Sequence, residues 1–201
     1  MKKYLAYLFG VLVIGTYIWI IVLGNDPLQP AIAEKILRFH VLANSDSEED
    51  QRVKEAVRDA VGVYLQPILA SAGNLEETKD LVETHMETIV TIAENILRNE
   101  GFSYEVEARI TTTDFPEKTY GPYTFPKGSY EALQIVIGEG EGQNWWCVLY
   151  PNMCFRGTVY EVVEQDAENA LKEVLEPWEY ADVFSSGKLK LRFKLLECWG
   201  K

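Results

Sequence analysis

Residues 36–61 read ILRFHVLANSDSEEDQRVKEAVRDAV, and this stretch decides the fold because it encodes a strand, a turn and a helix in succession. Ile36–Leu42 is apolar at most positions, which predicts a central β-strand. The ANSDS run that follows is rich in turn residues, and Ser47 with Asp50 resembles a capping box that begins a helix. Apolar residues then recur at helical spacing as far as Leu69, so we expect one face of this helix to be buried.

The rest of the chain supplies further helices and strands around this unit. The expected strands are Tyr104–Ile110, Tyr130–Ile137, Trp145–Tyr150 and Lys188–Glu197, and the expected helices are Glu76–Asn99 and Glu161–Glu176. The second and third of these strands flank the run GEGEGQN, which predicts a hairpin, and Asp114–Gly128 reads as a loop. This order favours an α+β fold: a mostly antiparallel sheet with helices packed on one face, preceded by one N-terminal hydrophobic helix.

The N-terminus carries an apolar segment, since Tyr4–Leu23 contains no charged residue. Twenty helical residues span roughly 30 Å, the hydrocarbon thickness of a bilayer. Lys2 and Lys3 precede the segment, so that end is expected to stay in the cytoplasm and the rest of the chain to be exported. Two alternatives stay open: an uncleaved membrane anchor, or a signal peptide removed near Ala33.

The expected organisation therefore has three parts. Residues 1–25 are a signal peptide or N-terminal membrane anchor, residues 26–33 are a linker with two prolines, and residues 34–201 are an extracytoplasmic α+β domain. The net charge of −12 argues against a nucleic-acid partner. The GEGEG run lacks the Lys and Ser/Thr of a phosphate-binding loop, so the sequence predicts no cofactor and no small-molecule substrate.

Cys147 and Cys154 have six residues between them and lie on either side of a Pro-Asn turn. Two cysteines with no nearby histidine make at most half a zinc site. In an exported domain they are better explained as a disulfide, with two buried thiols as the alternative. Cys198 is then left over and is expected to pack within the last strand.

Trp145 and Trp146 follow each other on one expected strand, so their side chains should point to opposite faces of the sheet. Rigid aromatic side chains at a surface are good anchors for a partner protein. The alternative is that neighbouring structure covers both tryptophans.

The two histidines are the candidates for catalysis. His85 falls on the apolar stripe of the expected second helix and is interpreted as a core residue. His40 is expected at the end of its strand, just before Asn44, Ser45 and Asp46, where a Ser–His or Cys–His pair with Asp46 can be drawn. An exported cell-wall or peptide hydrolase using His40 is therefore the alternative function. The competing interpretation gives His40 the role of a polar strand end that orders the turn.

Two segments resemble one protein family. They are RFHVLANSDSEEDQRVKEAVRDAV (Arg38–Val61) and YEALQIVIGEGEGQNWWCVLYPNMCF (Tyr130–Phe155), and both are similar to stage II sporulation protein R of endospore-forming bacteria. The resemblance implies a non-catalytic signalling protein, made in the forespore and exported across its membrane into the intermembrane space. There it would activate a membrane-embedded aspartic peptidase that processes the pro-form of the mother-cell sigma-E factor.

A ligand that prefers the active arrangement of the peptidase would act by shifting its population of states. By position, the expected partner contacts are Trp145, Trp146, His40, Asn44, Ser45 and Asp46.

Overall fold

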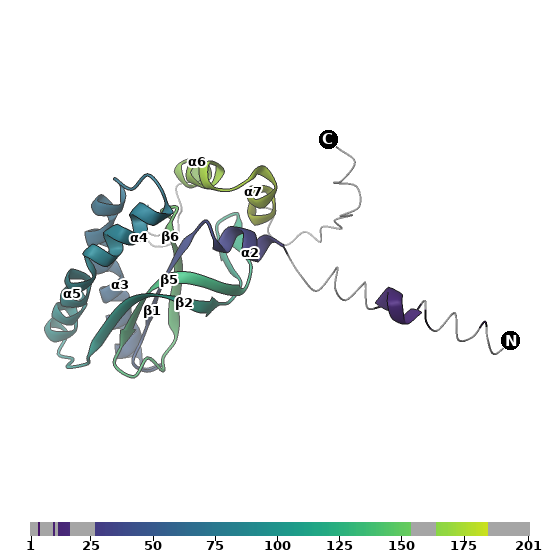
Figure 1. Cartoon of the computed structure of the whole chain (residues 1–201). Coiled ribbons are helices and arrows are strands. Elements are labelled where there is room, and N and C mark those ends of the chain that lie inside the picture. Colours follow the sequence, from purple (N-terminus) through teal and green to yellow (C-terminus); the bar gives the residue numbers. More distant parts are fainter. Residues whose placement is uncertain (1–3, 5–9, 11, 17–26, 154–163, 185–201) are drawn as a thin grey trace.

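The computed structural model describes residues 4, 10, 12–16, 27–153 and 164–184. Its elements follow the order α2 (Leu28–Ala33), β1 (Leu37–Leu42), α3 (Glu48–Leu69), α4 (Leu75–Thr84), α5 (Met86–Asn99), β2 (Val106–Phe115), β3 (Lys118–Tyr120), β4 (Tyr123–Phe125), β5 (Gly128–Ile137), β6 (Asn144–Tyr150), α6 (Glu164–Val174) and α7 (Pro177–Phe184). The α+β class with a mostly antiparallel sheet is confirmed. Helices α3, α4 and α5 lie on one side of the sheet, and α2, α6 and α7 lie on the other (Figure 1).

The main sheet has the strand order β2-β5-β1-β6. β1 pairs parallel with β5 and antiparallel with β6, while β2 pairs antiparallel with β5. The predicted hairpin of β5 and β6 is therefore wrong, because β1 lies between the two strands. Every residue of β1 except the last is buried, as expected for a central strand.

The first face of the sheet carries the larger core. Leu37, Phe39 and Val41 of β1 point into it and meet the apolar stripe of α3 together with buried residues of α4 and α5. Ser47 caps α3 as predicted, because its side chain accepts a hydrogen bond from the Asp50 N–H at 3.1 Å.

The predicted helix Glu76–Asn99 is two helices, α4 and α5, which meet at His85. The backbone of His85 leaves the helical region there, with φ −98° and ψ 8°. Its ring Nδ1 lies 2.6 Å from the Tyr64 hydroxyl, so this half-buried histidine bonds to α3 rather than lying inside a continuous apolar stripe.

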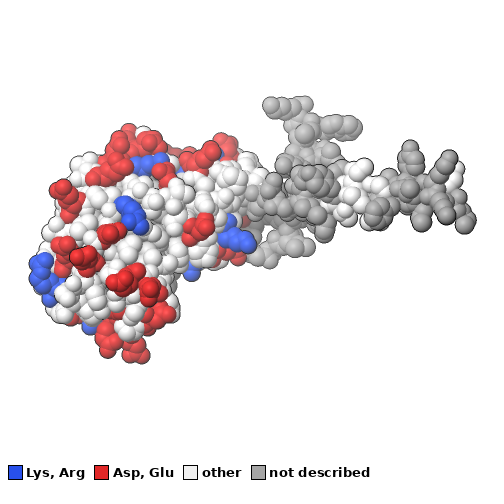
Figure 2. Space-filling model, turned by 60° about the horizontal axis from the view of Figure 1, so that its bottom comes forward, with Lys and Arg blue, Asp and Glu red and all other residues white. Residues whose placement is uncertain are grey.

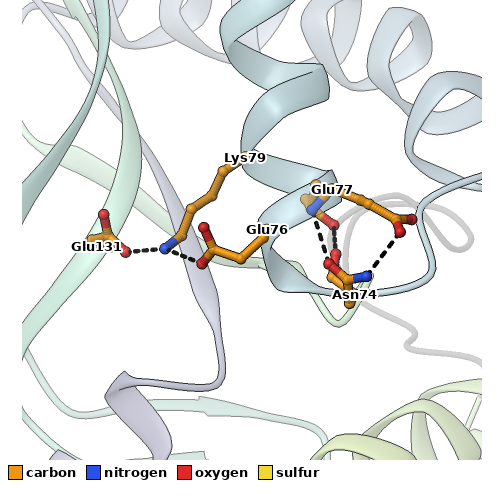
Figure 3. A network of polar contacts seen from close by, with 6 residues as sticks. Asn74, Glu76, Glu77, Lys79 and Glu131 are labelled. Atoms are coloured by element: carbon orange, nitrogen blue, oxygen red, sulfur yellow. Dashed lines mark hydrogen bonds and ion pairs between the residues drawn. The ribbon is translucent and has the colours of Figure 1, made fainter.

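Polar contacts fix the beginning of α4 (Figure 3). The Asn74 carboxamide oxygen accepts a hydrogen bond from the Glu77 N–H at 2.9 Å and caps the helix. The ammonium group of Lys79 lies 3.0 Å from the Glu76 carboxylate and 2.5 Å from that of Glu131, and the second contact joins α4 to β5.

The second face of the sheet is covered by α2, α6, α7 and a small hairpin of β3 and β4. This hairpin lies within Asp114–Gly128, which the sequence predicted as a loop. α2 occupies most of the predicted linker 26–33, and its Leu28 and Ile32 are buried. The segment thus packs on the domain instead of forming an extended spacer.

The two ends of the chain contain predictions that the structure only partly describes. The predicted helix Glu161–Glu176 corresponds to α6, and the predicted strand Lys188–Glu197 lies outside the described residues. Most of the apolar segment Tyr4–Leu23 also lies outside them. In the parts of the chain that are described, no helix has the length and apolar character needed to cross a bilayer.

Candidate functional site

The two segments that resemble the family, Arg38–Val61 and Tyr130–Phe155, meet at one end of the sheet. There the loop Gly138–Gln143 packs against the turn that follows β1. Asn44 holds the loop twice: its side-chain Oδ1 accepts a hydrogen bond from Glu139 N–H at 3.1 Å, and its carbonyl accepts one from Glu141 N–H at 3.2 Å. We call this arrangement of Ala43–Asp50 and Gly138–Gln143 the loop clasp.

Two further bonds complete the loop clasp. The carbonyl of Ala43 accepts a hydrogen bond from Gly142 N–H at 2.9 Å, and the Asp46 carboxylate accepts one from Gln143 N–H at 2.7 Å. Four backbone N–H groups of the loop thus donate hydrogen bonds to the turn, although the loop sequence suggests a mobile segment.

Glycine is required here for close approach. A Cβ on Gly142 would lie 2.2 Å from the carbonyl oxygen of Ser45, and one on Gly138 would lie 2.3 Å from Oδ1 of Asn44. Gly138 also has φ +58°, a backbone conformation that disfavours other residues. These glycines therefore hold the loop against the turn and do not serve to make it flexible.

Asp50 is the buried member of the loop clasp, and its carboxylate holds the side chains of the turn. It is 3% exposed, and its carboxylate accepts hydrogen bonds from Ser45 Oγ at 2.6 Å and from Asn44 Nδ2 at 3.0 Å. Desolvation raises the pKa of Asp50, but these bonds and one from Tyr104 outweigh it, so the pKa lies below its usual value. The carboxylate stays charged and fixes both side chains of the turn.

Asn44, Ser45 and Asp46, predicted as partner contacts, thus have partners within the chain. Asn44 and Ser45 are half-buried and Asp46 is exposed. What the loop clasp offers to solvent is a rigid acidic rim, formed by Glu139 and Glu141 of the loop and by acidic residues near it. These are Glu48, Glu49, Glu105 and Glu107, all exposed. In the view of Figure 2, acidic side chains outnumber basic ones over the described surface.

His40 lies inside β1 and not at its end. It pairs with Gln134 on one side and Trp146 on the other, and its side chain is only 1% exposed. The imidazole stacks on Trp146 with ring centroids 5.0 Å apart and planes 7° apart, and it contacts Phe115 at 5.3 Å.

The surroundings of His40 do not form the predicted catalytic pair. Neither ring nitrogen has a hydrogen-bond partner among the described residues, while Ser45 donates to Asp50 and Asp46 accepts from Gln143. Desolvation, with smaller contributions from the positive charges of Arg38 and Arg109, lowers the pKa of His40 to about 4. His40 is therefore a neutral, buried ring at neutral pH.

Trp145 and Trp146 lie on opposite faces of β6, as predicted. Trp145 packs edge-on against Phe39 at 5.4 Å in the first core, and the guanidinium of Arg58 lies 5.2 Å from its ring. Trp146 contacts Phe115 at 4.6 Å on the second face, besides its stack on His40. Both tryptophans are half-buried, so each keeps part of its ring in solvent.

Arg38 is a residue that sequence reasoning missed. Its side chain is fully buried, donates from Nε to the Cys147 carbonyl at 2.9 Å, and donates from Nη2 to the Tyr120 hydroxyl at 3.1 Å. Tyr120 in turn donates to the Trp146 carbonyl at 3.0 Å. Burial lowers the pKa of Arg38 from its usual value. Four aromatic rings surround the guanidinium, those of Phe115, Tyr120, Phe125 and Tyr130.

This aromatic enclosure positions Trp146. Tyr120 donates to the carbonyl of Trp146, and Arg38 donates to the carbonyl of the next residue, Cys147. These two hydrogen bonds fix the backbone of β6 at the position of the Trp146 side chain. The signal in the sequence was a charged residue within an otherwise apolar strand, which requires compensation when buried.

Cys147 is buried and disulfide-bonded. Cys154 and Cys198 both lie outside the described residues, so the pairing of Cys147 with Cys154 stays a prediction. Within the described ranges, no three His, Cys, Asp or Glu side chains are grouped to hold a metal ion.

Comparison with known proteins gives a consistent result. A model of the stage II sporulation protein R family matches residues 33–160, a range that contains the whole loop clasp and both tryptophans. The chain is 34% identical over 154 residues to stage II sporulation protein R of Bacillus subtilis (strain 168), covering 76% of this chain and 68% of the relative. No solved structure matches the chain significantly.

Proposed function

Because the chain belongs to the stage II sporulation protein R family, which acts in sporulation signalling, we propose that it is an exported, non-catalytic ligand that activates a membrane-embedded aspartic peptidase. That peptidase then removes the pro-sequence of the mother-cell sigma-E factor. Residues 1–25 act as the export signal, and Cys147 pairs with Cys154 in the space outside the forespore membrane.

The observation that carries the proposal is the family match. The matched residues 33–160 include the loop clasp and both tryptophans, which are the surface features that a partner protein could contact. Hydrogen bonds of the loop clasp hold the backbone that carries Glu139 and Glu141, and the enclosure around Arg38 holds the backbone beside Trp146. A preordered surface loses little conformational entropy on binding, which suits a ligand that acts through contact alone.

The mechanism is a shift of population. A ligand moves an equilibrium between inactive and active peptidase only by the difference in its affinity for the two states. A domain that binds the active arrangement more tightly by a factor of about 100 shifts the equilibrium by about 2.7 kcal/mol, enough to make a minor active state dominant.

The test is reconstitution in a non-sporulating host that co-expresses this chain, the peptidase and the pro-sigma factor. Processing of the sigma factor is expected only when all three are present and this chain is exported. Absence of processing with all three proteins folded and present would contradict the proposal.

The tryptophans are tested in the same host. Trp145→Ala and Trp146→Ala are compared with Trp178→Ala, which removes an exposed tryptophan of α7. If Trp145 or Trp146 anchors the peptidase, its replacement lowers processing while Trp178→Ala does not, at equal amounts of folded protein. Full processing by both of the first two variants would remove the tryptophans from the contact surface.

A further inference from the structure

The outer strand β2 is a long and regular sheet edge. It pairs with β5 in one continuous register, from Val106 opposite Ile137 to Phe115 opposite Gly128, with no bulge. On its other side no described strand is paired with it. Such edges present backbone hydrogen-bonding groups that can template another strand, and proteins usually shorten, bend or cover them.

The register fixes which backbone groups face outward. Gly138 N–H donates to the Glu105 carbonyl at 2.9 Å, which makes these opposed residues a hydrogen-bonded pair at the end of the ladder. In an antiparallel ladder hydrogen-bonded and non-bonded pairs alternate, so the odd-numbered residues of β2 bond to β5. The backbone N–H and C=O groups that face away from the sheet belong to Val106, Ala108, Ile110, Thr112 and Asp114.

We propose that this edge binds an extended segment of the partner, which adds a strand next to β2. The inference rests on the proposed function, since the partner is the peptidase named there. Main-chain hydrogen bonds to alternate residues of β2 supply the affinity, and side chains along the edge select the segment.

Charge selects a basic segment. Glu107 and Asp114 of β2 are exposed, as is Glu105 immediately before the strand. The one basic residue of β2, Arg109, already pairs with Glu107 at 2.9 Å. Beside the strand, Lys79 is held between two carboxylates. Lysine or arginine side chains on the incoming strand would therefore meet the carboxylates of Glu105 and Asp114, which form no ion pair with a described residue.

The same charges disfavour a second copy of this chain as the occupant. Two chains would bring together net charges of −12 each, and β2 would place acidic residues on both sides of the new ladder. Because the edge repels a second copy of this chain and attracts a basic strand, it is suited to a different protein that offers a positively charged segment.

Thr112→Pro tests the edge directly. Thr112 is exposed and its N–H faces away from β5. Proline at this position removes one outward hydrogen-bond donor, and its ring hinders the approach of an added strand, while the hydrogen bonds between β2 and β5 stay intact. Thr112→Val is the matched control, because it keeps the N–H and suits a strand. Thr111→Pro removes a donor to β5 and serves as a reference for a broken sheet.

In the reconstituted host, Thr112→Pro is expected to lower processing about ten-fold or more, whereas Thr112→Val retains it. Processing by folded Thr112→Pro at the wild-type level would overturn the proposal. Lack of processing by the wild-type chain would instead refute the proposed function. The two failures can be told apart because the wild-type chain is assayed before any variant.

Amide hydrogen exchange supplies a second measurement, which decides if Thr112→Pro fails to fold. The full wild-type chain is incubated with host membranes that contain the peptidase or lack it. Slower exchange at alternate amides of β2, from Val106 to Asp114, only with the peptidase supports strand addition. Unchanged exchange at these amides would overturn it, whether or not processing occurs.

Discussion

Acidification is expected to destabilise the fold through His40. The ordinary pKa of histidine is 6.5, and in the folded chain burial lowers it to about 4. Because the folded pKa is depressed, the neutral ring contributes fully to stability above pH 6.5, and this contribution falls as the pH drops toward 4. The difference amounts to about 2 kcal/mol at pH 5 and about 3 kcal/mol below pH 4.

The structural cause is the burial of the imidazole, with no negative counter-charge beside it among the described residues. His40 is enclosed by Trp146 and Phe115, and the charged groups that influence it are the guanidinium groups of Arg38 and Arg109. A protonated imidazole would therefore lose hydration and meet two positive charges, with no acceptor among the described residues for either N–H.

The assay is urea denaturation of the full chain, followed by circular dichroism at about pH 7.5 and about pH 5. The matched variant is His40→Phe, which keeps an aromatic ring between Trp146 and Phe115 but does not titrate. The loss of unfolding free energy between the two pH values should be about 2 kcal/mol larger in the wild type than in His40→Phe. Equal losses in both proteins would refute the reasoning.

Three further substitutions test other parts of the structure by the same denaturation. Gly142→Ala places a Cβ against the Ser45 carbonyl and should cost about 2 kcal/mol with faster exchange of the loop amides; unchanged stability would mean that the loop clasp is looser than described. Ser47→Ala removes the cap of α3 and should cost about 1 kcal/mol, whereas Ser47→Asn, which can still cap, should cost little. Lys35→Met leaves the carboxylate of Glu179, 2% exposed, without the ammonium group now 2.8 Å away, and should cost about 2 kcal/mol; a gain in stability would contradict this.

The sequence predicted those elements whose signals are local. The strand β1 and the helix α3 were placed within one or two residues, because an apolar run, a capping serine and a helical stripe lie next to one another in the chain. The break at His85 was not predicted, since the apolar spacing continues across it and the bond to Tyr64 depends on the packing of α3. Local pattern therefore gave the elements, and tertiary contact divided one of them.

The sheet order could not be predicted in the same way. Two strands separated by six residues usually pair, and the insertion of β1 between β5 and β6 depends on contacts far apart in the sequence. Once β1 is inserted, the short connection has to cross the end of that strand. This crossing is why the loop needs glycines at Gly138 and Gly142 and why Asn44 lies beneath it.

For the candidate site, the sequence indicated two segments that the structure brings together, but not the contacts that their residues make. Asn44, Ser45 and Asp46 stood out as polar residues after a strand, and the structure shows that their side chains form hydrogen bonds within the loop clasp; their role as partner contacts stays a prediction. His40 seemed available for catalysis because its burial is invisible in the sequence. Arg38 was overlooked because the four aromatic rings that surround it come from four later strands of the chain.

The central place of β1 has a consequence for how the chain assembles. β1 is the first strand made, but Arg38 in it pairs with Ala132 and Val148, so both of its neighbours arrive only after most of the chain has been synthesised. Until then its apolar residues have no sheet to join, and an incomplete chain would expose them to premature association. Closure of the sheet around β1 thus depends on the arrival of the C-terminal half of the chain.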